Sequence, residues 1–118
     1  MVRPMLTAAI LLTATPALAG PKGYAVTELI INDQKAFTSE YAPRMNALVA
    51  KCGGHFIVAT NESIVLRGDK PKGRVVIVEY PSLQAARACY DSATYKAAIP
   101  LRDKITTGRT FFVEGTAK

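Results

Sequence analysis

Residues 74–102 read RVVIVEYPSLQAARACYDSATYKAAIPLR, and this stretch decides the fold. Its first part, Arg74 to Tyr80, is rich in β-branched residues and predicts a strand. Because Val75 to Val78 are apolar at consecutive positions, this strand needs cover on both of its faces. The stretch therefore indicates a sheet that lies between two other layers.

The second part of this stretch predicts helices. Pro81 and Ser82 form a turn, with Ser82 as the N-cap of a helix, and the apolar residues that follow recur at helical spacing: Leu83, Ala86 and Tyr90. A break at residues 91–94 precedes a second helical segment, residues 95–104, which carries Pro100 in its middle.

Working outward, the same signals predict the other elements. A first strand at residues 24–31 leads through Asn32 and Asp33, which offer an N-cap, into a helix over residues 34–51. Pro43 predicts a kink in that helix near Tyr41 and Ala42, and Gly53 and Gly54 end it. The remaining elements are an interrupted second strand, residues 55–59 and 63–66, a turn at residues 68–73 and a last strand at residues 109–114.

The order strand, helix, strand, strand, helix, strand predicts an α+β class and a ferredoxin-like βαββαβ fold. In this fold a four-stranded antiparallel sheet carries both helices on one face. The other face keeps apolar side chains from the third and fourth strands, so we expect a homodimer that packs through the open sheet face.

The first 19 residues have the pattern of an export signal. Arg3 gives a positive start, residues 5–14 form a short apolar core, and Ala17-Leu18-Ala19 offers a cleavage site after Ala19. The alternatives are an uncleaved membrane anchor and a first core strand. With cleavage, 118 − 19 = 99 residues remain, so residues 20–118 are expected to form a single periplasmic or secreted domain without stable membrane insertion.

The net charge is +6, or +5 without Arg3, and its one local group is Arg67, Lys70, Lys72 and Arg74. An anionic partner is one explanation, and a solvated hairpin tip is the other. No aromatic side chains interleave with these cations as a single-strand binder requires, so we expect no nucleic-acid partner.

Cys52 and Cys89 remain after cleavage, in a compartment that favours oxidation. They are disulfide candidates, and two separate buried thiols are the alternative. Their separation of 37 residues excludes a C-x-x-C redox pair. Two cysteines and one histidine make a poor metal set, so we expect no metal and no cofactor.

Several pieces together resemble a known family. They are Gly53-Gly54 before a strand, Arg74 with VVIVEYPS, Ala85-Ala86 with Tyr90-Asp91-Ser92, Tyr95, Arg102, and Val113-Glu114-Gly115. This pattern, over residues 22–115, resembles the domain of unknown function 1330 family of the dimeric α+β barrel superfamily. The resemblance implies a ferredoxin-like fold and a dimer, and it implies no particular chemistry. Arg67 and His55 depart from the residues common in the family, so no role is carried over to them.

Two residues are candidate catalytic bases. His55 is the only histidine, and histidine is a residue type that often serves as a general base or a ligand; the alternative is a surface histidine of an edge strand. Glu79 lies in an apolar strand and should pair with Arg44, Arg74 or Arg102, either as a pocket base or as half of a structural ion pair.

Tyr41, Tyr90 and Arg102 are candidate ligand-binding residues in a pocket between sheet and helices, and a packed core is the alternative for the tyrosines. Three classes of function follow. The first is a small-ligand-binding or accessory dimer without catalysis. The second is a cofactor-free enzyme, monooxygenase- or isomerase-like, that uses His55 or Glu79 as base. The third is a structural or stress-related interaction domain.

Overall fold

The computed structural model describes residue 4 and residues 20–117. Four antiparallel strands form one sheet in the order β2-β3-β1-β4. The elements in chain order are β1 Gly23–Ile31, α1 Gln34–Ala36, the π-helical turn η1 Phe37–Tyr41, α2 Ala42–Lys51, β2 His55–Thr60, β3 Arg74–Tyr80, α3 Leu83–Tyr90, α4 Ala93–Ile105 and β4 Thr106–Glu114.

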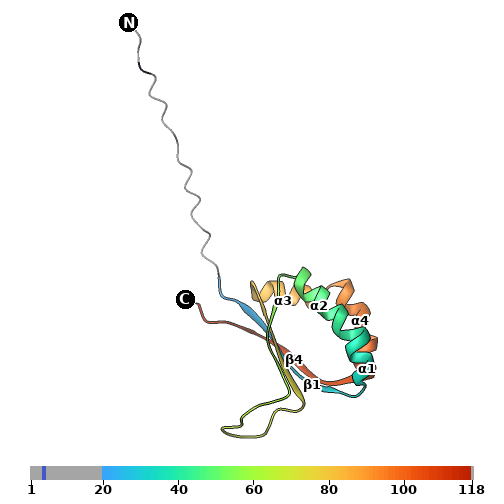
Figure 1. The fold of residues 1–118 in the computed structure, drawn as a ribbon. Helices are drawn as coiled ribbons and strands as arrows, with labels where there is room; N and C mark the ends of the chain where they lie inside the picture. The colour runs from blue at the N-terminus through green and yellow to red at the C-terminus, as the bar shows by residue number, and fades with distance from the viewer. Residues whose placement is uncertain (1–3, 5–19, 118) are drawn as a thin grey trace.

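The helices form one layer that covers one face of the sheet, and the other face is left uncovered (Figure 1). This arrangement is the ferredoxin-like α+β fold that the sequence predicts. Within the described residues no helix is long and apolar enough to span a membrane. The expected export signal, residues 1–19, lies outside the described residues apart from Pro4.

The helix starts are set by local side-chain chemistry. The Asp33 carboxylate accepts the backbone N–H of Ala36 at 3.0 Å, and the Ser82 hydroxyl accepts that of Ala85 at 3.0 Å. Each side chain satisfies a donor that the first helical turn leaves free. After the C-terminal end of α2, Gly53 adopts a φ of +75°, a conformation that glycine takes without steric cost.

The first helix is interrupted where the sequence predicts a kink. A π-helical turn lies directly before α2, and the N–H of Ala42 donates to the carbonyl of Phe37, five residues earlier. Pro43 has no N–H, so it cannot take part in the regular bonding of this turn. The expected single helix is therefore built of three parts.

Strand register divides the side chains of the sheet between its two faces. On the helix face, one row across the sheet is Phe56, Val78, Ala25 and Phe112. On the open face, the row Val58, Ile77, Val26 and Phe111 is wholly apolar. Because neighbours along a strand alternate between faces, β3 presents apolar residues to both.

The prediction that residues 63–66 form the second half of the second strand is wrong. β2 ends at Thr60, and residues 61–73 form a long connection to β3 rather than pairing as a strand. Ile64 and Leu66 are 100% and 99% exposed. A register shift lies between Phe56 and Val58, inside β2. Residues 63–66 have a strand-like composition, but no strand of the described residues pairs with them.

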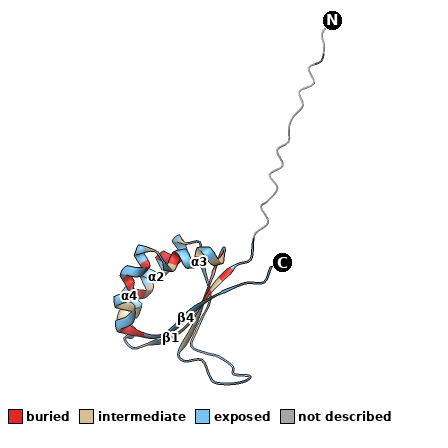
Figure 2. Cartoon of the chain, turned by 180° about the vertical axis from the view of Figure 1, so that it is seen from behind, coloured by how far each residue is buried: buried red, intermediate tan, exposed pale blue. Residues whose placement is uncertain are grey.

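The core lies between the sheet and the helices (Figure 2). Its buried members include Val49 of α2, Val78 and Tyr80 of β3, and Ala86 of α3. A disulfide joins Cys52, directly after α2, to Cys89 of α3, with Cα atoms 5.8 Å apart. The disulfide fastens α2 to α3 across the core.

Candidate functional site

A cavity of about 100 Å³ lies between the helix layer and the sheet. The sheet contributes side chains from its helix face, and the helices contribute the π-helical turn, α2 and one residue of α3. The lining residues are Thr27, Leu29, Phe37, Tyr41, Ala42, Met45, Asn46, Val49, Phe56, Val76, Val78 and Tyr90. The volume suits a group about the size of a single small ring.

The cavity opens beside the edge strand β2. Phe56 of β2 is 43% exposed and Asn46 of α2 is also exposed, whereas Val49, Val78 and Tyr41 are buried. The exposed lining residues therefore mark the mouth and the buried ones mark the inner wall. Among the described residues no strand pairs with the outer side of β2, so the mouth lies at a free edge of the sheet.

The lining carries no charged side chain. Its polar groups are the hydroxyls of Thr27, Tyr41 and Tyr90 and the amide of Asn46. An ion placed here would lose its hydration without gaining a counter-charge, which is strongly unfavourable. The chemistry of the wall therefore suits a neutral, mainly apolar molecule with one or two hydrogen-bonding groups.

Tyr90 is the centre of an aromatic cluster behind the cavity. Its ring centroid lies 4.6 Å from that of Tyr95, 5.1 Å from that of Phe112 and 6.5 Å from that of Tyr80. The contacts with Phe112 and Tyr80 are edge-to-face, the arrangement that aromatic quadrupoles favour. Tyr90 is thus both a core residue and part of the cavity wall. Its position fits both alternatives that the sequence leaves open for this tyrosine, a pocket residue and a packed core.

The phenols of the cavity are neutral. Burial raises the pKa of Tyr90 far above its ordinary value of 10.0, and the neighbouring phenols of Tyr80 and Tyr95 add to the rise. Burial likewise raises the pKa of Tyr41, with a further contribution from Tyr95. Both hydroxyls therefore keep their protons at physiological pH.

These raised pKa values predict the alkaline behaviour of the domain. The folded state binds the phenolic protons more tightly than the unfolded state. The contribution of these groups to the free energy of unfolding is therefore fully present below about pH 10 and is lost as pH rises beyond it. After a jump to high pH, phenolate absorbance should rise in a fast phase from accessible tyrosines and a slow phase that follows unfolding. Tyr41→Phe and Tyr90→Phe should each remove amplitude from the slow phase alone. Equal loss from the fast phase would show that these phenols ionise in the folded domain.

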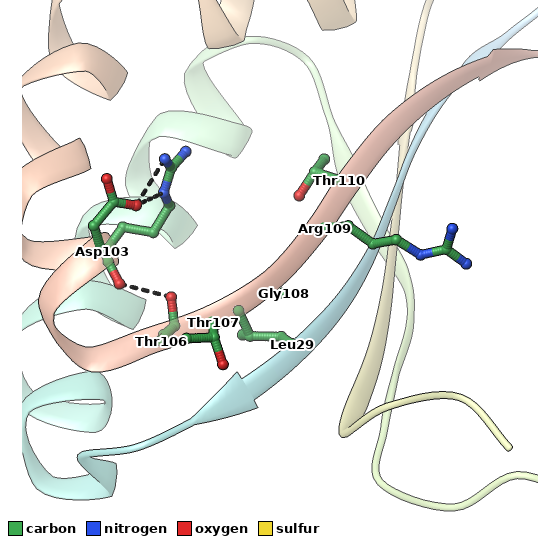
Figure 3. Close-up of a pocket in the computed structure, with 8 residues that line it drawn as sticks. Leu29, Asp103, Thr106, Thr107, Gly108, Arg109 and Thr110 are labelled. Atoms are coloured by element: carbon green, nitrogen blue, oxygen red, sulfur yellow. Dashed lines mark hydrogen bonds and ion pairs between the residues drawn. The ribbon is translucent and has the colours of Figure 1, made fainter.

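Arg102 lies outside this cavity. Its Nη1 donates to the Tyr95 hydroxyl at 2.8 Å, and its Nε and Nη2 reach Asp103 Oδ1 at 2.9 and 2.8 Å. The guanidinium borders a second, open hollow between α4 and β4, where Thr106 donates to the Arg102 carbonyl at 2.7 Å (Figure 3). The structure therefore brings Tyr41 and Tyr90 together and places Arg102 behind them, in contact with the cluster through Tyr95.

His55 and Glu79 lie on the opposite face of the sheet from the cavity. They are register partners on β2 and β3, in the row that continues through Tyr24 to Val113. The Tyr24 hydroxyl donates to Glu79 Oε2 at 3.1 Å, and this bond raises the pKa of Tyr24. The expected pairing of Glu79 with an arginine is wrong: within the described residues the ion pairs are Arg102 with Asp103 and Arg109 with Glu28.

Sequence reasoning missed most of the cavity wall. Thr27 and Asn46 supply half of its polar groups, yet neither stands in a motif. One signal was available: Phe37, Tyr41 and Met45 recur at four-residue spacing on the predicted helix and continue to Val49. That stripe indicates a buried face, and it cannot reveal that the face leaves a void.

The comparisons with known proteins agree with this architecture. A four-stranded antiparallel sheet with its helices on one face defines a ferredoxin-like α+β domain. Residues 22–116 match the family model described as Domain of unknown function (DUF1330), and the chain belongs to this family. The search of curated proteins returned no match.

Solved structures match this chain at low sequence identity, and the first two share its fold. A protein of unknown function from Rhodopseudomonas palustris is 18% identical, with 85% of each chain covered and a TM-score of 0.65. The methylated form of that protein is 15% identical over 81% of this chain and 82% of its own, with a TM-score of 0.64. A Caulobacter crescentus protein described provisionally as an antibiotic biosynthesis monooxygenase is 19% identical over 83% of this chain and 92% of its own, with a TM-score of 0.47.

Proposed function

We propose that this domain binds a small, neutral, mainly apolar molecule in the cavity between helices and sheet, without catalysing its conversion. The observation that carries the proposal is the uncharged cavity of about 100 Å³, whose wall is apolar apart from two hydroxyl-bearing tyrosines, Thr27 and Asn46. A ring or short branched chain with one polar group fits this chemistry. The candidate export signal supports a periplasmic or extracellular location for this binding.

Catalysis by His55 or Glu79 receives no support from the geometry. Both residues lie on the open face, with the thickness of the sheet between them and Tyr41 or Tyr90. A general base must come within hydrogen-bond reach of the proton that it removes. A molecule held in the cavity is out of reach of both groups, so binding alone describes the site best.

Binding can be tested with ring-sized probes by NMR. Benzene and phenol should shift resonances of Thr27, Tyr41 and Val76, whereas benzoate at the same concentration should not, because its charge finds no counter-ion in the wall. Ala42→Phe fills part of the cavity and should abolish the shifts. His55→Ala and Glu79→Gln, on the opposite face, are the matched controls and should leave them unchanged. If neither benzene nor phenol perturbs the lining residues, the binding proposal is wrong.

We also propose that the domain is a homodimer that packs through its open sheet face. The apolar row Val58, Ile77, Val26 and Phe111 crosses all four strands on that face, and Phe111 is 41% exposed. A continuous apolar strip of this kind is costly to leave in water and typical of an interface. A second copy supplies the same strip, as a two-fold interface requires.

A further inference from the structure

The connection between β2 and β3, residues 61–73, is here called the arm. Its Ile64 and Leu66 are 100% and 99% exposed, and Arg67 follows directly. Two aliphatic side chains that the described residues leave fully exposed have no role in the core of this domain. Both are free to contact a partner.

The arm lies on the open-face side of the sheet. Residues 69–72 share a hollow with Glu28 and Arg109, which point from the open face of β1 and β4. Figures 1 and 2 show the arm extending from the end of the sheet on the side away from the helices. A molecule that covers the open face therefore meets the arm as well.

The opposite end of the same face carries a complementary charge. Glu79 is partly buried, accepts one hydrogen bond from Tyr24 and takes part in none of the ion pairs of the described residues. It lies four residues along β3 from Val75, about 13 Å at the rise of a strand. The arm carries three basic residues, Arg67, Lys70 and Lys72, and two acidic ones, Glu62 and Asp69, so its net charge is 3 − 2 = +1. The open face thus has an apolar arm of net positive charge at one end and, at the other, a carboxylate that is in no ion pair of the described residues.

This asymmetry selects one orientation for two copies packed face to face. A two-fold axis parallel to the strands would bring the two cationic arms together. An axis in the interface and perpendicular to the strands brings each arm to the Glu79 end of the other copy. Like charges at an interface are unfavourable and opposite charges favourable, so the second orientation is preferred.

We propose that the arm docks on a second copy of this chain, with Ile64 and Leu66 packed against the open face of that copy and Arg67 paired with its Glu79. This inference rests on the proposed homodimer and adds to it the residues that orient the dimer. A guanidinium suits this role because it can bind a carboxylate through two parallel hydrogen bonds.

Sedimentation of the protein from residue 20 onward tests the inference through the dimer dissociation constant. Ile64→Ser with Leu66→Ser should raise the constant roughly a hundredfold, because four aliphatic side chains lose their burial in each dimer. The fold should persist, since the described residues leave these side chains fully exposed. The control Lys96→Glu, on the exposed surface of α4, should leave the constant unchanged.

An exchange of charges tests the orientation. Arg67→Glu and Glu79→Arg should each weaken the dimer about tenfold, and the double variant should return to within about threefold of the unchanged protein. Absence of rescue in the double variant would overturn the pairing of Arg67 with Glu79.

The failures of the two proposals are distinguishable. A monomeric unchanged protein at micromolar concentration overturns both the homodimer and the arm contact. A dimer that survives the Ile64 and Leu66 changes but is disrupted by Ile77→Glu, at the centre of the open face, overturns the arm contact alone. Binding to anionic vesicles that requires Ile64 and Leu66, with an unchanged dissociation constant, would assign the arm to a lipid surface instead.

Discussion

Replacing Cys52 and Cys89 together by alanine is expected to lower the free energy of unfolding by about 4 kcal/mol. The bond closes a chain segment with a sequence separation of 37 residues, so its loss returns considerable entropy to the unfolded chain. For a domain of this size the midpoint of thermal unfolding should fall by at least about 15 °C. Chemical denaturation without reductant measures the change directly.

Reductant supplies the control for this prediction. It should destabilise the unchanged protein to nearly the same extent and leave the double alanine variant unaffected. Equal stability of the two proteins before reduction would contradict a stabilising disulfide, as would two thiols that react with an alkylating agent in native protein prepared without reductant.

Tyr90→Ala is expected to cost about 3 kcal/mol of folding stability and to change the cavity at the same time. The substitution removes the ring that contacts Tyr80, Tyr95 and Phe112 and that forms part of the cavity wall. Because the neighbouring side chains close only part of such a space, the cavity should enlarge and accept larger aromatic probes than benzene. Denaturation and probe titration measure the two effects.

Tyr90→Phe is the matched variant, because it keeps the ring and removes only the hydroxyl. It should cost less than about 1.5 kcal/mol and leave benzene binding intact. A loss as large as that of Tyr90→Ala would show that the hydroxyl, and not the ring, stabilises this region.

Much of the fold could be predicted because its signals are local. Asp33 and Ser82 cap their helices through side-chain hydrogen bonds that span three residues, and β3 has the predicted bounds Arg74–Tyr80. The strand predicted at residues 63–66 is wrong for the converse reason. Its β-branched composition is typical of a strand, but a strand also needs a neighbour with free backbone groups, and no local pattern reports where that neighbour lies.

The site could be predicted only in part. The helical spacing of Tyr41 and Tyr90 predicts a buried face, and both residues line the cavity. The face of the sheet that carries Glu79 could not be predicted, because β3 is apolar on both faces and its composition gives no sign of which face the helices cover. Only the register with β1 settles that Val78 points to the helices and Glu79 away from them.

The size of the cavity depends on the number of residues in the π-helical turn. Phe37 and Tyr41 bound this turn, and both line the cavity. A π turn holds one residue more than a regular α turn, so deleting one residue between them would restore a regular helix. Phe37 and Tyr41 would then be three residues apart instead of four, and the part of the cavity wall between them would narrow. Among relatives, the number of residues between the end of the first strand and the glycine pair should therefore separate domains that keep this chamber from those that have closed it.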